Sequence, residues 1–285
     1  MPEKKLRKKE KYDKRNALND LSGREWLLLT KSIWISEKNG DDKFAFQHPA
    51  PFLINDIRKL IRFFTKENMV VLDPFCGSGT TLVASARENR KGIGIDLNKK
   101  YCQMSRKRLQ DLKLKKNQQV ICGDSLKKLS KIKGKIDYCV TSPPYHNILR
   151  HNGGGLRDSK DKDVRNGSRL GVEYYSNDKR DLGNQTQYKD FLRLLKEVMT
   201  EVYKKLREKK YCSIIISDFT VNKKETNASG DVIRLMQDIG FGFEGAVVLV
   251  QDNKPLYPFG YPYAYKMNHH HQFILNFRKF LLTKI

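Results

Sequence analysis

The sequence lacks the features that define several large classes of protein. It has no run near the roughly 20 apolar residues of a membrane span, and no apolar segment follows its first residues as in a secretory signal. Its five cysteines lie far apart without a Cys-x-x-Cys pair, so neither a zinc ribbon nor a disulfide framework is expected. We therefore expect a cytoplasmic protein that contacts no membrane and needs no metal.

Acidic residues are also scarce. The 285 residues include 32 Asp and Glu against 56 Lys and Arg, which gives a formal net charge of +24. Such an excess favours polyanions, because cationic side chains neutralise phosphates and release counterions. A lysine-rich surface that is merely solvated is the alternative, so the charge favours nucleic acid without deciding the matter.

The order of apolar and polar segments indicates how the chain is organised. Residues 1–20 hold eight Lys and Arg and are expected to form a basic flexible arm, followed by a single domain over residues 21–285. Apolar residues between 21 and 46 are expected to pack on that domain. Residues 146–186 are rich in Gly, Asn and charge, and are typical of a long loop or an insertion.

An alternation of strands and helices begins after a predicted helix at residues 55–66. Strands are expected at 69–73, 92–96, 120–124, 136–141 and 211–217, and helices at 79–89, 98–115, 188–209 and 231–238. This rhythm predicts an α/β fold with a parallel sheet covered by helices on both faces. The last two apolar runs, 243–250 and 272–277, have little room for a helix between them and predict an antiparallel pair at the sheet edge.

A glycine-rich turn follows the first of these strands. It reads Asp-Pro-Phe-Cys-Gly-Ser-Gly-Thr-Thr over residues 73–81 and opens a helix. Glycines allow close backbone approach to a ligand, and the N–H groups at a helix start favour anionic groups. No Gly-Lys-Ser/Thr follows, which excludes a Walker A loop and makes ATP unlikely as a ligand.

Three successive strands of the pattern end in or just before an aspartate: Asp73, Asp96 and Asp124. In an open α/β sheet, ligands bind beyond the carboxyl ends of the strands, and an acidic side chain about twenty residues after the glycine turn can bind ribose hydroxyls. The three carboxylates therefore outline a pocket for a nucleoside. Turn and N-cap aspartates are the alternative interpretation.

The fourth strand ends in Thr-Ser-Pro-Pro-Tyr, residues 141–145. The two prolines stiffen the chain and leave the carbonyl of Pro143 free to accept a hydrogen bond. Ser142 adds a hydroxyl acceptor and Tyr145 a flat face. This set suits an amino group on a flat heterocycle, although an X-Pro-Pro turn that caps a strand would have the same sequence.

Together these motifs resemble the amino-group DNA methyltransferases, which make N4-methylcytosine or N6-methyladenine. The likeness rests on Asp-Pro-Phe-x-Gly-Ser-Gly-Thr followed by Thr-Ser-Pro-Pro-Tyr, and spans roughly residues 21–279. It implies a Rossmann-like, doubly wound, mostly parallel sheet of seven strands with one antiparallel edge strand. It also implies S-adenosylmethionine as cofactor and double-stranded DNA as partner.

The resemblance assigns roles to individual residues. The cofactor-binding set that it implies is His48, Pro49, Phe52, Asp73, Pro74, Phe75, Gly77, Ser78, Gly79, Thr80, Asp96, Leu97, Asp124 and Ser125. The catalytic set is Ser142, Pro143, Pro144 and Tyr145. The target base is flipped out of the duplex at a cost of roughly a few kcal/mol, Tyr145 stacks on it, and Ser142 and the Pro143 carbonyl accept hydrogen bonds from its amine.

The choice of base rests on analogy with the family. Members with Ser at the first position of the tetrapeptide are mostly cytosine-N4 enzymes, and Ser142 therefore favours cytosine. Adenine N6 methylation of DNA is the nearest alternative, followed by methylation of an RNA amino group and by a non-catalytic nucleic-acid-binding protein.

A separate recognition domain is not expected. The best candidate for reading DNA is the segment 146–186, with Arg150, Arg157, Arg165 and Arg169, assisted by phosphate contacts from the basic arm. A cognate restriction endonuclease is a further partner that the family suggests.

Two other clusters stand out near the end of the chain. His269, His270 and His271 are not expected to bind a metal, because alternate residues of a strand face opposite ways. The aromatic residues between 257 and 265 leave three interpretations open: a base pocket, a partner surface, or packing of an irregular hairpin.

Overall fold

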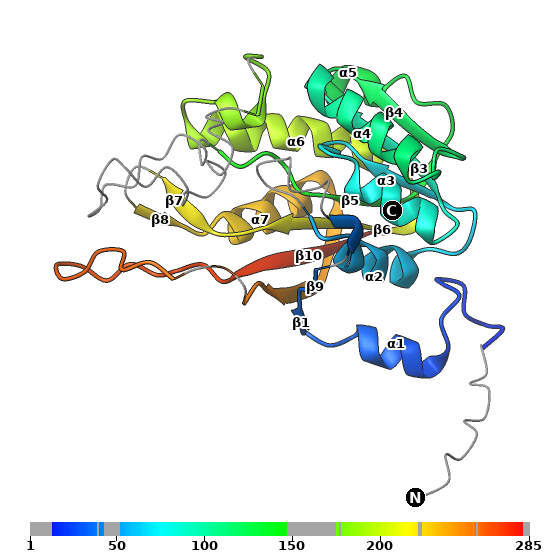
Figure 1. Ribbon diagram of the computed structural model, residues 1–285, viewed down its shortest axis with the longest axis horizontal. Coiled ribbons are helices and arrows are strands. Elements are labelled where there is room, and N and C mark those ends of the chain that lie inside the picture. Colours follow the sequence, from blue (N-terminus) through cyan, green and yellow to red (C-terminus); the bar gives the residue numbers. More distant parts are fainter. Residues whose placement is uncertain are drawn as a thin grey trace, which may run out of the picture.

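The computed structural model consists of a central sheet with helices on both sides (Figure 1). It describes residues 13–38, 40–42, 52–146, 175–176, 178–221, 224–252, 254 and 256–281. The strands are β1 (Ile33–Ile35), β2 (Val70–Asp73), β3 (Lys91–Asp96), β4 (Gln118–Cys122), β5 (Ile136–Thr141), β6 (Leu206–Ile216), β7 (Phe219–Val221), β8 (Lys224–Thr226), β9 (Phe241–Val250) and β10 (His271–Lys279). The helices are α1 (Gly23–Leu29), α2 (Ile54–Phe64), α3 (Thr80–Arg87), α4 (Lys99–Asp111), α5 (Ser125–Leu129), α6 (Tyr188–Lys205) and α7 (Ala228–Ile239), with a 3-10 turn, η4 (Leu182–Asn184).

The main sheet has the strand order β1-β9-β10-β6-β5-β2-β3-β4, and β7 and β8 form a separate hairpin. All neighbouring pairs from β6 to β4 are parallel, whereas β10 runs antiparallel to both β6 and β9. The expected doubly wound, mostly parallel sheet with an antiparallel pair toward one edge is confirmed. It has eight strands rather than seven, because Ile33–Ile35 adds to β9 as a short parallel strand.

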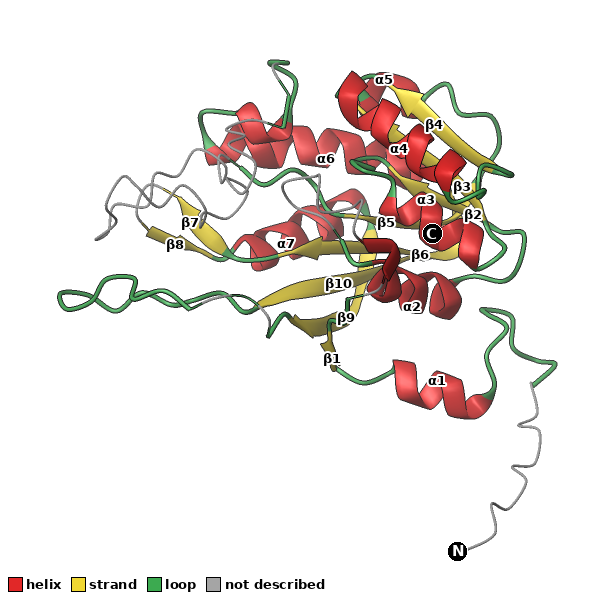
Figure 2. Ribbon diagram, viewed as in Figure 1, coloured by secondary structure: helices red, strands yellow, loops and turns green. Residues whose placement is uncertain are grey.

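Helices lie on both faces of the sheet (Figure 2), and each face has its own hydrophobic core. Helices α2, α3 and α4 cover one face, where Ile57, Leu82 and Leu109 are buried. Helices α5, α6 and α7 cover the other face with residues such as Leu195 and Met236. None of the helices in the described ranges is long and apolar enough to cross a lipid bilayer.

Local sequence explains why these elements form where they do. All six residues of β5 are buried, as expected for a central strand covered on both faces. In α6 the buried residues Phe191, Leu195 and Val202 recur at helical spacing. Helix α7 begins at Asn227, whose side chain accepts from the N–H of Gly230, and ends at Gly240 with φ of 111°.

The N-terminal segment packs on the domain only in part. Trp34 of β1 is buried, and the ring of Trp26 lies 5.0 Å from a phenylalanine ring of α2. By contrast, α1 has no buried residue, and Leu27 and Leu28 are 70% and 51% exposed. The apolar residues of this segment are consecutive, so a helix spreads them around its axis instead of gathering them on one face.

The last residues of the predicted basic arm contact the domain. Asn19 is fully buried and its amide donates to the carbonyl of Phe63 at 2.6 Å. Asp20 forms an ion pair with Arg90 at 3.3 Å. Residues 1–12 of the arm, and residues 147–174 and 177 of the segment 146–186, lie outside the described residues.

Candidate active site

The carboxyl ends of β2, β3, β4 and β5 meet at one edge of the sheet. Asp73 at the end of β2 is in register with Gly94 of β3, and Asp96 at the end of β3 with Cys122 of β4. Asp124 follows β4 after one glycine. The parallel topology thus brings the three aspartates and residues 142–145 to the same edge, as the sequence predicts.

Asp73 is the centre of this edge and is only 1% exposed. One carboxylate oxygen accepts from the hydroxyl of Thr141 and the other from the hydroxyl of Thr81, both at 2.6 Å. The N–H of Phe75 adds a third bond at 3.1 Å. Burial raises the pKa of Asp73 to about 6, against the effect of these three donors. Because protein donors occupy both oxygens, Asp73 fixes the turn and its neighbour strand β5.

The turn after Asp73 requires glycine at two positions. Gly77 and Gly79 have φ of 49° and 80°, in the left-handed region that other residues rarely adopt. A Cβ on Gly79 would also lie 2.1 Å from the Oγ of Ser105 on α4. The backbone of the turn is therefore drawn close to α4, and the N-terminus of α3 starts at the sheet edge.

Asp96 binds this turn to the end of β3. Its carboxylate accepts from the N–H of Gly77 and from the N–H of Asn98, each at 2.8 Å. Burial raises the pKa of Asp96 to about 7. The side chain is nevertheless partly exposed, and a carboxylate has about four lone-pair positions. It therefore has acceptor capacity left for hydroxyl groups of a ligand.

Asp124 and Ser125 close the edge on the β4 side. Asp124 caps α5 by accepting from the N–H of Leu126, and it pairs with Arg180 at 3.2 Å. The Ser125 hydroxyl donates to the carbonyl of Pro74 at 2.5 Å. The two residues thus connect α5 to the glycine turn and to the segment before η4.

The segment Ser142–Tyr145 leaves β5 directly beside the Asp73 turn. Ser142 is half-buried and Pro143 is buried. The hydroxyl of Tyr145 accepts from the N–H of Ser217 at 3.1 Å and from the side-chain amide of Gln272 at 2.8 Å. Its ring stacks on Phe219, with centroids 5.8 Å apart and 16° between the planes. Burial raises the pKa of Tyr145, so the hydroxyl stays protonated at neutral pH.

Other residues of the implied cofactor set have structural contacts. The Ser78 carbonyl and the Thr80 hydroxyl accept from the buried guanidinium of Arg108. Phe75 and Phe52 are partly buried against the two cores. Leu97 is half-buried directly after Asp96. His48 and Pro49, like Arg150, Arg157, Arg165 and Arg169, lie outside the described residues.

Three residues to which the sequence assigned no functional role belong to this edge. Gln272 and Ser217 hold the hydroxyl of Tyr145 from distant points of the chain. Tyr175 is buried, its carbonyl accepts from the side-chain amide of Asn98 at 2.6 Å, and its hydroxyl is hydrogen-bonded to the backbone of Tyr145. No local sequence pattern marks Gln272 or Tyr175, because their partners, Tyr145 and Asn98, lie far from them in the sequence.

The residues present fit the S-adenosylmethionine that the resemblance implies. The left-handed φ angles of Gly77 and Gly79 shape a turn that starts α3 at the sheet edge, where the N–H groups of a helix start favour a carboxylate such as that of the cofactor. Asp96 has a partly exposed carboxylate, the type of acceptor that suits ribose hydroxyls. Within the described ranges, no group of three or more His, Cys, Asp or Glu side chains is placed to hold a metal ion.

Known proteins resemble this chain in sequence over a limited part of its length. The orphan methyltransferase M.BamHII of Bacillus amyloliquefaciens is 43% identical over 75 residues, which are 26% of this chain and 28% of that protein. The type II methyltransferase M2.DpnII of Streptococcus pneumoniae is 38% identical over 109 residues, 38% of each chain. The matches thus cover well under two thirds of these relatives.

Solved structures resemble this chain in fold. TrmN from Thermus thermophilus has a TM-score of 0.51 and 14% identity, over 84% of this chain and 52% of that one. NSun6 from Pyrococcus horikoshii, solved with SFG, has a TM-score of 0.50 and 16% identity, over 79% of this chain and 50% of that one. At these identities the likeness concerns the Rossmann-like fold.

Two family models match the chain. The model described as DNA methylase matches residues 1–107, and the model described as methyltransferase domain matches residues 65–239. The second spans more than half of the chain and includes the glycine turn, Asp96 and the Ser142–Tyr145 segment. S-adenosylmethionine is the cofactor of this fold. The chain belongs to the methyltransferase family that the second model describes.

Proposed function

We propose that this protein is an S-adenosylmethionine-dependent DNA methyltransferase that methylates an exocyclic amine of a flipped base, with cytosine N4 preferred. The observation that carries the proposal is the 2.6 Å hydrogen bond between the Thr141 hydroxyl and Asp73. This bond joins the last residue of β5, directly before Ser142, to the first residue of the glycine turn. The elements assigned to the cofactor and to the base thereby share one buried carboxylate.

In this proposal the chain itself mainly positions the amine. The bound cofactor supplies an electrophilic methyl group. The Ser142 hydroxyl and the Pro143 carbonyl accept hydrogen bonds from the base amine and orient its lone pair. Tyr145 stacks on the base with the ring face turned away from Phe219. Its hydroxyl is anchored by Ser217 and Gln272, so the ring is fixed before the base arrives.

The preference for cytosine rests on Ser142. A hydroxyl is a neutral acceptor, whereas the Asp that is usual at this position in adenine enzymes carries a charge. Adenine N6 is the alternative within the same mechanism, and the relatives named above do not distinguish the two bases.

The remaining assignments follow from DNA as the substrate. We propose that residues 146–186 read the bases through Arg150, Arg157, Arg165 and Arg169, and that the basic segment 1–20 contacts phosphates. A cognate restriction endonuclease would recognise the same site, and the protein would work on the nucleoid in the cytoplasm.

Nucleoside mass spectrometry tests the proposal. The protein is expressed in a host free of DNA methylation, beside a Ser142→Ala/Tyr145→Ala variant, and the DNA is digested to nucleosides. N4-methylcytosine with the wild type alone is the expected result. N6-methyladenine would retain the mechanism and overturn the choice of base. The absence of both would contradict methylation of DNA, and the same assay on RNA would then test an RNA amine.

A further inference from the structure

The connection between β9 and β10 is the most exposed aromatic segment of the described chain. Within its residues 256–267, Tyr261, Tyr263 and Tyr265 are 72%, 94% and 87% exposed, and Leu256 is 73% exposed. Figure 1 shows this loop projecting beyond the sheet, far from the main body. Packing of an irregular hairpin, one of the interpretations open from the sequence, does not account for rings that are mostly solvated. Exposed apolar patches of this kind mark interaction sites.

The loop leaves the sheet at the same edge as the candidate active site. β9 runs parallel to β6, because both are antiparallel to β10. The end of β9 at Val250 therefore lies at the edge where β2 and β5 end. The start of β10 contacts the active site directly, because Gln272 donates to the Tyr145 hydroxyl and the His271 carbonyl accepts from Ser217.

The loop is also tied to the hairpin β7–β8. The Nε2 of His269 lies 2.9 Å from a carboxylate oxygen of Glu225 on β8, and the Lys254 ammonium donates to the carbonyl of His269 at 3.4 Å. The base of the loop is thus anchored, while its tip extends away from the anchor.

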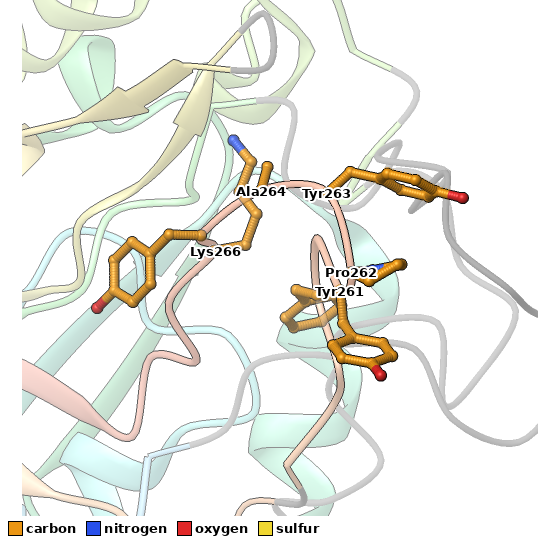
Figure 3. A pocket seen from close by; sticks show the side chains of 7 residues that line it. Tyr261, Pro262, Tyr263, Ala264 and Lys266 are labelled. Carbon is orange, nitrogen blue, oxygen red and sulfur yellow. The ribbon is translucent and has the colours of Figure 1, made fainter.

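The shape of the tip does not depend on the exposed rings. The side-chain amide of Asn268 accepts from the N–H of Tyr257 at 3.0 Å and donates to the carbonyl of Tyr257 at 2.8 Å. The N–H groups of Tyr263 and Ala264 donate to the carbonyl of Gly260. Gly260 has φ of 77°, and a Cβ on it would lie 2.2 Å from the carbonyl oxygen of Ala264. In Figure 3 the side chains of Tyr261, Tyr263 and Lys266 point outward in different directions.

The charge of this part of the chain selects the kind of partner. Residues 253–285 contain no Asp or Glu, whereas they contain four Lys and one Arg. Such a segment is compatible with phosphate backbones. In a duplex the bases are stacked on one another, so exposed rings contact the sugars, the base edges and opened base steps in a groove.

We propose that the loop 256–267 contacts DNA and binds the duplex beside the target base. Tyr261, Tyr263 and Tyr265 pack against bases and sugars in a groove, and Lys266 contacts a phosphate. The loop continues into β10, where Gln272 donates to the hydroxyl of Tyr145. This connection couples the DNA contact of the loop to the site that receives the base. The proposal rests on the proposed function, since it assumes that DNA is the substrate.

The test uses the full chain and a Tyr261→Ser/Tyr263→Ser/Tyr265→Ser variant. Affinity is measured by fluorescence anisotropy on a random-sequence DNA duplex, and methyl incorporation is measured on unmethylated plasmid DNA. The variant is expected to lose roughly 10- to 100-fold in duplex affinity, with unchanged affinity for S-adenosylmethionine and unchanged melting temperature. The triple Tyr→Phe variant should retain duplex affinity, because packing in a groove requires the rings and not the hydroxyls.

Two further variants sharpen the result. Lys266→Gln should lower the slope of log affinity against log salt by about one. Leu27→Ser/Leu28→Ser changes exposed apolar residues on α1 and should leave duplex affinity unchanged.

The outcomes separate this proposal from the proposed function. If the wild type methylates DNA and the triple Ser variant binds and methylates it equally well, the loop 256–267 does not contact DNA. A protein partner would then be the next candidate to bind the loop. If the wild type transfers no methyl group to DNA, the proposed function has failed, and the proposal about the loop 256–267 is overturned with it.

Discussion

The two halves of the sheet reach the same edge by different means. Between β2 and β4 the site is built from backbone: the N–H groups of Gly77 and Asn98 hold Asp96, and the glycines permit the turn. Between β5 and β10 it is built from side chains that hold one another across the sheet. Gln272 reaches Tyr145 over a sequence separation of 127 residues, and Ser217 over 72.

Because of this difference, we expect substitutions in the two halves to affect different properties of the protein. The first half tolerates little added volume, because its backbone is packed against α4. The second half has one ring held by two donors and by Phe219, so single changes there should alter the position of the ring more than the fold. Substitutions in the first half should therefore affect stability and cofactor binding, and substitutions in the second should affect turnover.

The largest effect is expected for Gly79→Ala. The new Cβ would lie 2.1 Å from Ser105, and the left-handed φ adds strain. Together these cost roughly 2–5 kcal/mol in the free energy of unfolding. Gly134→Ala is the matched control, because Gly134 has φ of 79° with nothing within 4 Å of its Cβ, and should cost about 1–2 kcal/mol. Urea denaturation measures both, and equal costs would contradict the tight packing of the turn.

Next in size is the effect of Asp96→Ala on cofactor binding. Removing the carboxylate frees the N–H groups of Gly77 and Asn98 and deletes the acceptors proposed for the ribose. Charged hydrogen bonds are each worth about 1.5–3 kcal/mol, so affinity for S-adenosylmethionine should fall about 100-fold or more. Titration calorimetry measures the fall, and Asp111→Ala, an exposed change of the same charge, should leave affinity intact. Retained affinity in Asp96→Ala would remove the ribose assignment.

A smaller effect, on turnover alone, is expected for Tyr145→Phe. The substitution retains the ring but leaves the N–H of Ser217 and the amide of Gln272 without their acceptor. At about 1–3 kcal/mol for an unsatisfied buried donor, the single-turnover rate should fall roughly 10- to 100-fold at unchanged cofactor affinity. Tyr211→Phe is the control on β6. A loss of cofactor affinity in Tyr145→Phe would break the division between the two halves.

The smallest effect is a dependence of cofactor affinity on pH. The pKa of Asp96 is raised to about 7 by burial, so the free protein holds a proton there below pH 7, whereas ribose hydroxyls favour the ionised acceptor. Affinity should therefore increase up to about tenfold per pH unit below pH 7 and level off above it. Calorimetry from pH 5.5 to 8.5 measures this, and the slope should disappear in Asp96→Asn.

The sign of the stability effect is the opposite. Because the folded pKa of Asp96 lies above its unfolded value near 3.9, its contribution to stability is present below about pH 4. That contribution is lost as the pH rises toward 7. Thermal melts of the ligand-free protein should show this loss, and S-adenosylmethionine should reverse it.

The sequence predicts the first half of the site better than the second for a physical reason. Asp73 and Asp96 end adjacent parallel strands and Gly77 lies in the turn after the first of them, so their order along the chain already implies that they are neighbours. The partners of Tyr145 depend on the register of β10 against β6, which no local pattern specifies. The added strand β1 was missed because three residues with Ile at both ends carry no clear periodicity. The aromatic loop left three interpretations open, because exposure is a property of the folded chain.

The most direct test of the account compares binding and transfer in the Ser142→Ala/Tyr145→Ala variant. Calorimetry gives its affinity for S-adenosylmethionine, and incorporation of a labelled methyl group into unmethylated DNA gives its activity. The account predicts cofactor affinity within about threefold of the wild type and no detectable transfer. Transfer at the wild-type rate would contradict the assignment of these residues to the base. So would a variant that loses both cofactor binding and methyl transfer.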